Sequence, residues 1–270
     1  MGLRLSIGGE EFRLVASPVV LGAVAERYGS FVTPATGTSR DRDPITIEIR
    51  CRPDRFAPAY ERPVEAHARE SAPGEITLAG AVCGHYSIAA RQGSIEDASG
   101  LGAVDSLLRM ALSAALPLDG ALLLHGAALR QGRAGGIALC GASGSGKSTA
   151  AAALGAFCDE LVVLRPTENG LELYSTPYWT GRPFRARCAA VVCLVRGGAP
   201  GVVSLRGAAA ARALAPHVVR YVAVERIDRA VLGLLCSIGS CADVKLASCP
   251  EGDEFISFLT GKLRFEKNAA

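Results

Sequence analysis

A glycine-rich segment near the middle of the chain carries the most specific chemistry. Residues 141–148 match the pattern G-x-x-x-x-G-K-S/T without deviation, and Thr149 follows. Glycines let such a loop curl so that successive backbone N–H groups point inward at a helix N-terminus, where phosphate oxygens bind. Lys147 is expected to reach the β- and γ-phosphates, and the Ser148 hydroxyl to bind Mg²⁺. The sequence therefore predicts a site for ATP and Mg²⁺, formed by Gly141, Ala142, Ser143, Gly144, Ser145, Gly146, Lys147, Ser148 and Thr149.

The sequence on either side of the loop fits the same interpretation. An apolar run at residues 137–140 predicts a strand, and an alanine-rich run at residues 148–155 predicts a short helix. This strand, loop and helix order is the context that a phosphate-binding loop requires. A dinucleotide-binding fingerprint is excluded, because Lys147-Ser148-Thr149 follows Gly144-Ser145-Gly146 and puts a threonine where the third glycine would fall.

An acidic pair, Asp159 and Glu160, follows the predicted helix at the start of an apolar run at residues 161–164. A carboxylate at the start of such a strand can face the phosphates, hold Mg²⁺, or take a proton from an attacking hydroxyl. The alternative interpretation is a charge pair at the end of the helix with no role in chemistry.

The chain from Leu124 to Glu160 resembles the HPr kinase/phosphorylase family. It is most similar to the smaller members, some of which modify ribosomally made peptides. The resemblance rests on His125-Gly126, about twenty residues before Lys147, on the glycine-rich loop, and on the acidic pair. A downstream segment, Ser175-Thr176-Pro177-Tyr178-Trp179, also looks like a turn of the smaller members.

The resemblance implies roles for individual residues. Asp159 would be the general base that activates a substrate hydroxyl, and Glu160 would assist Ser148 and Asp159 in holding Mg²⁺. His125 would lie near the γ-phosphate, so that Asp159, His125 and Lys147 form the expected catalytic group. Glu160 stands where HPr kinases have a second aspartate, and no segment aligns with the signature of their phosphorolytic reaction, which argues against that activity.

Other polar residues have weaker signals. His125 is equally explained as a histidine satisfied by backbone at a strand end, whereas His67 and His217 lie in loop-like surroundings and are expected at the surface. Three arginines follow the predicted turn: Arg182, Arg185 and Arg187. They could neutralise phosphate, hold an acidic substrate, or belong to a solvated loop.

The elements that must position these residues divide the chain in two. Residues 1–100 are expected to form a β-rich N-terminal region, and residues 101–270 a P-loop HPr-kinase-like domain. The resemblance implies a mixed sheet in that domain, and the fold class is α/β with α+β character. Strands are predicted at residues 3–7, 11–15, 45–50, 75–78, 85–90, 121–129, 136–140, 161–164, 171–174, 189–195 and 244–247. Helices are predicted at residues 101–116, 148–155, 208–215, 221–235 and 251–259, and a loop at residues 51–74.

Composition excludes several classes of function. The net charge of +3 indicates neither a nucleic-acid partner nor an anionic membrane, and 49% hydrophobic with 20% charged residues is typical of a globular protein. The longest apolar runs are short of the ~18 residues that a membrane span needs. We therefore expect a cytoplasmic protein. Its nine cysteines form no CxxC motif and are interpreted mainly as buried thiols, although Cys83 and His85 have a spacing that could hold a metal.

Three functions remain open. The first is a kinase that transfers the γ-phosphoryl group of ATP to a hydroxyl, expected to be a serine, of a peptide or small protein. The second is a P-loop ATPase, which is disfavoured because no segment resembles the L-S-G-G-Q motif of transporter ATPases. The third is a peptide-binding module in which the nucleotide only stabilises the fold. The family includes ring-shaped oligomers, so a homo-oligomer is allowed.

Overall fold

The chain forms two compact units in the computed structural model. Unit 1 consists of residues 1–119 and 220–228, and unit 2 of residues 120–219 and 229–270. The structure describes residues 2–34, 42–51, 56–57, 66–80, 82–96, 98–132, 135–178, 181–197, 199–250, 252 and 254–263. The expected boundary near residue 100 therefore falls later, after Asp119, because the long helix before it belongs to unit 1.

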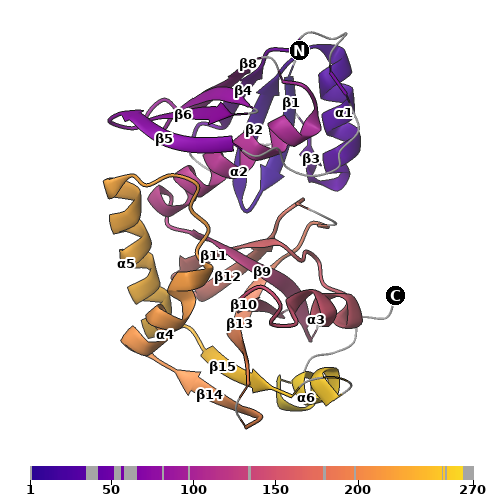
Figure 1. Cartoon of the computed structure of the whole chain (residues 1–270), viewed down its shortest axis with the longest axis vertical. Coiled ribbons are helices and arrows are strands. Elements are labelled where there is room, and N and C mark those ends of the chain that lie inside the picture. Colours follow the sequence, from indigo (N-terminus) through magenta and orange to yellow (C-terminus); the bar gives the residue numbers. More distant parts are fainter. Residues whose placement is uncertain are drawn as a thin grey trace. The chain divides into compact units, whose positions relative to one another are not determined.

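Unit 1 is built on an eight-stranded mixed sheet with the order β3-β1-β2-β4-β8-β7-β6-β5 (Figure 1). Its strands are β1 (Gly2–Ile7), β2 (Glu10–Val15), β3 (Val32–Thr33), β4 (Ile45–Ile49), β5 (Ala66–Ala72), β6 (Glu75–Gly80), β7 (Cys83–Ser87) and β8 (Gln92–Glu96). β4 pairs in parallel with β2 and β8, and the other pairs are antiparallel. The prediction of a β-rich N-terminal region is confirmed.

Two α-helices accompany this sheet, α1 (Pro18–Tyr28) and α2 (Leu101–Leu118). α2 follows the predicted apolar periodicity and buries Asp105 and Arg109, whose side chains form an ion pair at 2.5 Å. Tyr28 of α1 donates a hydrogen bond to the same aspartate at 2.9 Å, so the buried Asp105 carboxylate has two polar partners. Within the described part of the chain, α2 alone has the length and apolar composition of a membrane span, and 89% of it is buried, as in the core helix of a folded domain.

Unit 2 contains a seven-stranded mixed sheet with the order β10-β9-β11-β12-β13-β15-β14. Its strands are β9 (Leu122–Gln131), β10 (Gly135–Gly141), β11 (Leu161–Thr167), β12 (Gly170–Ser175), β13 (Arg185–Arg196), β14 (Gly201–Leu205) and β15 (Val244–Cys249). β10 also pairs in parallel with β13. This additional pairing makes a closed ring of five paired strands, β10-β9-β11-β12-β13. The sheet is mixed, as expected, and the α/β class with α+β character is confirmed.

The helices of unit 2 are α3 (Lys147–Leu154), α4 (Gly207–Leu214), α5 (Glu225–Cys241) and α6 (Glu254–Leu263), with the 3₁₀ turn η2 (Ala215–His217). The division between the units crosses α5 after Asp228. α3 and α6 share a buried cluster with one face of the sheet; its members include Leu129, Leu139, Ala150, Leu154, Val192, Leu194, Phe255 and Leu259. This core holds the helix that follows the glycine-rich loop.

Several elements differ from the predictions. α1 and the 3₁₀ turn η1 (Gly29–Phe31) replace part of a region expected to contain only strands and turns. β5 lies inside the predicted loop at residues 51–74; the rest of that loop falls largely outside the described residues. β8 and β14 were not predicted, and α2 continues through Pro117 to Leu118 instead of ending before the proline.

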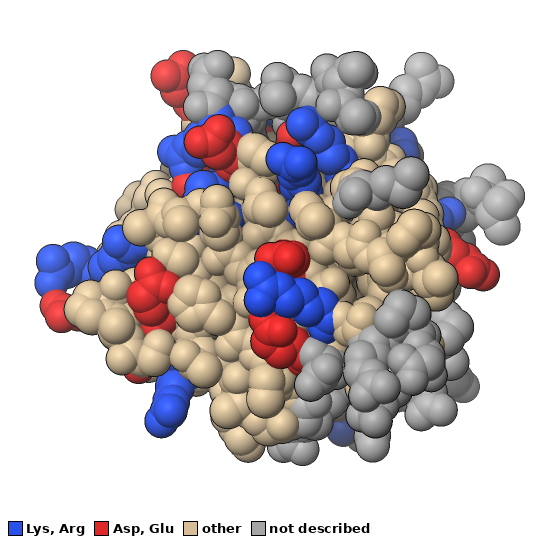
Figure 2. Space-filling model, turned by 90° about the horizontal axis from the view of Figure 1, so that it is seen from above, with Lys and Arg blue, Asp and Glu red and all other residues tan. Residues whose placement is uncertain are grey.

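Charges and cysteines follow the expectations in part. On the face shown in Figure 2, basic and acidic side chains are interspersed on a mostly uncharged surface, and no single-sign patch is visible there.

All nine cysteines have free thiols. Five of them are buried: Cys140, Cys158, Cys188, Cys193 and Cys249. Cys83, Cys236 and Cys241 are exposed, which corrects the expectation for those three.

Candidate functional site

The loop between β10 and α3, with the residues that flank it, is called the P-loop (residues 141–147). Gly144 and Gly146 have φ values of +75° and +95°, in the left-handed region that favours glycine. Gly141 has no room for a side chain, since an added Cβ would lie 3.0 Å from the carbonyl oxygen of Leu194 on β13. Gly146 caps α3 without a side-chain hydrogen bond, so no capping side chain engages the first N–H groups of that helix. Two left-handed glycines and an uncapped helix N-terminus are features that an anion-binding loop requires.

Lys147, the first residue of α3, is held against its own loop. Its side chain is buried, and Nζ donates hydrogen bonds to the carbonyl oxygens of Gly141 at 2.7 Å and Ala142 at 3.0 Å. Burial lowers the pKa of Lys147, and the nearby Asp159 carboxylate opposes that shift. Because an ammonium group has three N–H donors, the lysine keeps one donor beyond these two hydrogen bonds.

The P-loop strand lies beside the strand that carries His125. β9 and β10 are antiparallel, and Cys140 of β10 is opposite Gly126 of β9. A Cβ on Gly126 would lie 2.7 Å from the carbonyl oxygen of Leu139, so only glycine allows this close approach. The His125-Gly126 pair therefore has a physical reason: the glycine lets β10 approach closely, and the histidine is placed at the end of β10 where the P-loop begins.

Asp159 and Glu160 lie on the other side of β9, just before β11. Leu161 pairs with His125 across the two strands, and the backbone N–H of Gly126 donates to the carbonyl oxygen of Glu160 at 3.0 Å. The buried hydroxyl of Thr176 donates to the carbonyl oxygen of Leu161 at 2.7 Å, which ties the predicted 175–179 turn to the start of β11. Trp179, the last residue of that turn, lies outside the described residues.

The Asp159 carboxylate faces the P-loop. Ser148 forms a side-chain hydrogen bond with it, and Lys147 and His125 act on it electrostatically. Its Oδ1 atom is buried and has no hydrogen-bond partner in the described structure. Burial raises the pKa of Asp159, and the hydrogen bond from Ser148 partly offsets that effect. One carboxylate oxygen thus has no hydrogen-bond partner of its own among the described residues.

The charges of Lys147, Asp159 and Glu160 act electrostatically on His125. Its side chain reaches the surface, yet desolvation by the surrounding protein and then the charge of Lys147 lower its pKa. Glu160 and Asp159 oppose this shift. The structure therefore brings together His125, Lys147, Ser148 and the acidic pair, which the sequence analysis grouped.

His217 belongs to the same cluster, although the sequence analysis expected it at the surface. It ends η2, and the following residues run beside β9: Val218 pairs with Leu124, and the N–H of Val219 donates to the carbonyl oxygen of Leu123 at 2.8 Å. Burial lowers the pKa of His217, with smaller contributions from Lys147 and His125. No local motif marks this histidine, because only the pairing of residues 218–219 with β9 brings it to the site.

Arg196 is a second residue that the sequence analysis did not select. β13 pairs in parallel with β10, with Leu194 opposite Gly141, so β13 ends at Arg196 beside the P-loop. A Cβ on Gly144 would lie 3.9 Å from the Arg196 guanidinium, which places this cation against the apex of the loop. Among the described residues Arg196 forms no ion pair.

Two of the three downstream arginines, Arg185 and Arg187, lie toward the other end of β10, at the beginning of β13. Arg187 pairs with Gly135, six residues from Gly141, which corresponds to about 20 Å along the strand. Arg185 donates to Glu172 at 2.8 Å, and the Arg182 guanidinium lies 5.3 Å from the centre of the Phe157 ring. The hypothesis that Arg185 and Arg187 neutralise a phosphate at the P-loop is therefore wrong.

The residues present fit a magnesium ion. Mg²⁺ is usually held by one or two protein oxygens together with phosphate oxygens and water. Ser148 and Asp159 supply a hydroxyl and a carboxylate that already contact each other, with Oδ1 of Asp159 unsatisfied. Within the described residues no cluster of three or more His, Cys, Asp or Glu side chains could hold a metal, so the spacing of Cys83 and His85 forms no such site.

Comparison with models of known protein families and with curated proteins found no match for this chain.

Proposed function

We propose that unit 2 is an ATP-dependent kinase that transfers the γ-phosphoryl group to a hydroxyl, a serine, of a peptide or small protein. The observation that carries the proposal is the Asp159 carboxylate, which is hydrogen-bonded to Ser148, lies in the electrostatic field of Lys147, and has one buried oxygen without a hydrogen-bond partner. The resemblance to HPr kinase-like proteins points to the same reaction. We place the protein in the cytoplasm, where ATP and peptide acceptors are both present.

Each residue of the cluster has a role in this proposal. The P-loop N–H groups and Lys147 bind the phosphate oxygens, and Ser148 and Asp159 hold Mg²⁺, with Glu160 assisting from the adjacent position. Bound MgATP supplies the phosphoryl group and the metal charge that neutralises it. Asp159 accepts the proton of the acceptor hydroxyl as its oxygen bonds to phosphorus and the bond to the departing ADP oxygen breaks. The raised pKa of Asp159 suits a base, because it increases the affinity of the carboxylate for that proton.

His125 and His217 supply hydrogen-bond donors instead of charge. The pKa of each is lowered, primarily by burial, so both imidazoles are neutral at pH 7. A neutral imidazole can donate one hydrogen bond to a phosphate oxygen without adding to the positive charge of Lys147. Positioning and charge neutralisation then account for most of the expected rate.

The test is phosphoryl transfer by the full chain. The protein is incubated with Mg²⁺, γ-labelled ATP and peptides randomised around one serine, threonine or alanine, and both label transfer and phosphate release are measured. We expect transfer to serine peptides, and a loss of about 10²–10⁴-fold in Asp159→Asn while nucleotide binding through the loop N–H groups and Lys147 persists. The matched control is Asp243→Asn, which removes a carboxylate paired with Lys245 at 3.3 Å elsewhere in unit 2.

Other outcomes overturn the proposal. Phosphate release without transfer to any peptide would identify an ATPase. Nucleotide binding with neither release nor transfer would identify a binding module. Full transfer by Asp159→Asn would remove this residue from the chemistry.

A further inference from the structure

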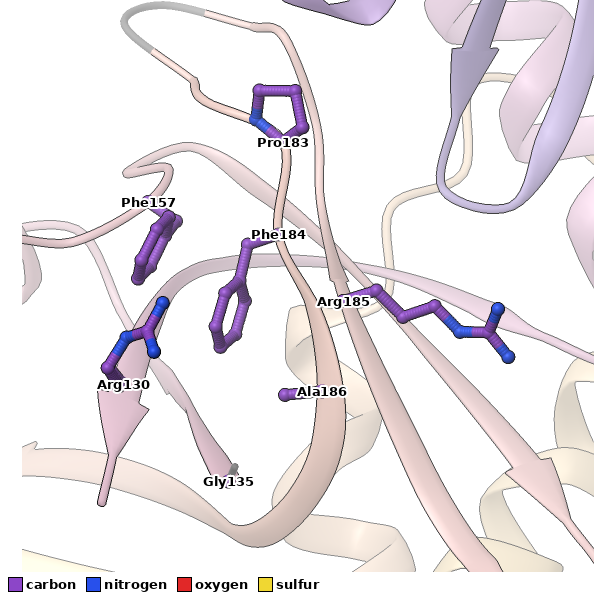
Figure 3. A pocket seen from close by; sticks show the side chains of 7 residues that line it. All are labelled: Arg130, Gly135, Phe157, Pro183, Phe184, Arg185 and Ala186. Atoms are coloured by element: carbon purple, nitrogen blue, oxygen red, sulfur yellow. The ribbon is translucent and has the colours of Figure 1, made fainter. Parts of the chain in front are cut away.

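A cavity of about 250 Å³ lies at the end of β9, β10 and β13 that is distant from the P-loop. Arg130, Phe157 and Phe184 line it, together with Gly135 and the beginning of β13 (Figure 3). Sites for drug-sized ligands usually measure roughly 300–1,000 Å³. The cavity is therefore suited to a single side chain and is too small for a nucleotide.

Two stacked rings and the Arg130 guanidinium line this cavity, and the Arg182 guanidinium lies against one of the same rings. The Phe157 and Phe184 rings are 4.2 Å apart and nearly parallel, and Figure 3 shows the Arg130 side chain directed at them. The Arg130 Cζ atom lies 5.2 Å from the Phe157 ring centre, and the Arg182 Cζ atom lies 5.3 Å from it. Contact with aromatic rings holds a guanidinium in place while leaving its in-plane N–H groups available to a carboxylate.

The charge around the cavity is uncompensated. Within the described part of unit 2 neither Arg130 nor Arg182 forms an ion pair, and none of the described residues that line the cavity is acidic. Arg185 differs, because it donates to Glu172 at 2.8 Å and extends away from the two rings (Figure 3). The cavity thus combines a small volume with one lining guanidinium, that of Arg130, and a second guanidinium, that of Arg182, on the Phe157 ring, neither in an ion pair among the described residues, which fits an anionic side chain.

The cavity is also within reach of the proposed catalytic carboxylate. The N–H of Phe157 donates to Ala128 at 2.8 Å, and the N–H of Arg182 donates to the carbonyl oxygen of Phe157 at 2.7 Å, so this edge is fixed by backbone hydrogen bonds. Phe157 precedes Asp159 by two residues, so their Cα atoms are at most ~7 Å apart. His125 and Arg130 are five residues apart on β9, or about 16 Å. An extended peptide covers these distances with two to five residues.

We propose that this cavity binds one aspartate or glutamate side chain of the acceptor peptide, two to five residues from the hydroxyl that is phosphorylated. The inference rests on the proposed function, because the peptide is the acceptor of that reaction. It adds a substrate class, acidic peptides, and a second contact point that selects the hydroxyl by its distance from an acidic residue.

Binding is tested without any reaction. The arginine Nε–H signals of ¹⁵N-labelled protein, assigned with Arg130→Gln and Arg182→Gln, are followed during titration with a ten-residue alanine peptide that carries one serine and, four residues away, one glutamate. We expect this peptide to move the signals of Arg130 and Arg182, and the same peptide with glutamine to leave them in place. Equal movement with the glutamine peptide, or with inorganic phosphate at the same concentration, would show a non-selective site and overturn the proposal.

Kinetics provide the second test. The Arg130→Gln/Arg182→Gln variant should raise KM for the glutamate peptide by about tenfold or more, as expected for loss of a charge-assisted hydrogen bond, and leave kcat and the KM for ATP unchanged. Arg212→Gln, which removes an exposed arginine on α4, is the matched control.

The two proposals fail in different ways. If glutamate-selective shifts occur but no peptide is phosphorylated, the kinase proposal is wrong and the anion-binding cavity stands. If peptides are phosphorylated with equal KM for glutamate and glutamine versions, the cavity proposal is wrong and the kinase stands.

Discussion

Gly146 gives the most direct test of how the P-loop is held. Its φ of +95° favours glycine, and a Cβ at this position would lie 2.7 Å from Cζ of the buried Phe255 ring on α6. Gly144 is a matched control in the same loop: its φ is +75°, but an added Cβ would meet nothing closer than the Arg196 guanidinium at 3.9 Å. The two alanine variants therefore share the backbone penalty and differ in the collision.

The expected sizes follow from these two terms. A left-handed alanine costs about 1–2 kcal/mol, and replacing glycine with alanine returns about 0.4–1 kcal/mol by restricting the unfolded chain. Gly144→Ala should therefore lower the free energy of unfolding by about 0–1.5 kcal/mol. Collision with a packed ring adds about 1–3 kcal/mol, so Gly146→Ala should cost about 1–4.5 kcal/mol.

Urea unfolding monitored by circular dichroism measures this difference. In a Phe255→Leu background, which removes the ring, the gap between the two alanine variants should shrink. Equal costs for Gly144→Ala and Gly146→Ala in the unmodified chain would refute the idea that Phe255 fixes the loop.

Three further predictions concern charges at the site. Lys147→Met should raise the pKa of both His125 and His217, because the lysine charge lowers both; histidine proton NMR across a pH series measures this, and unmoved midpoints would contradict the geometry. Asp159→Asn should raise the thermal stability of the ligand-free protein at pH 7. The folded-state pKa of Asp159 is raised, so its ionised form reduces stability, and the gain should shrink as pH falls from the folded-state pKa to the unfolded one. Arg196→Gln should weaken ATP affinity by about tenfold. Calorimetric titration at several salt concentrations measures this affinity, and an unchanged value would contradict the prediction.

An internal control is available for the measurement of ATP affinity. Arg212→Gln should leave ATP affinity unaltered, because that arginine lies on the exposed side of α4.

Local sequence signals were sufficient for the elements whose pattern is strong and self-contained. The apolar periodicity of α2, the alternation in β1 and β4, and the strand, loop and helix order around the P-loop each depend on residues close together in the chain. β5 shows the opposite case: its polar, mostly exposed residues have no apolar alternation, and it is a strand because it pairs with β6. α1 was not predicted, although Ser17 and Pro18 are residues that favour the start of a helix.

The sequence by itself determined the P-loop, its lysine and hydroxyl, and the acidic pair that follows, because these groups are placed by the conformation of one short segment. Only the tertiary structure decided which distant residues join them. His217 reaches the site because residues 218–219 pair with β9, and Arg196 because β13 runs parallel to β10. Arg130 and Arg182, far apart in the chain, both lie against the Phe157 ring, which stacks on Phe184. These contacts depend on strand pairing across long sequence separations, and such pairing leaves no local pattern in the chain.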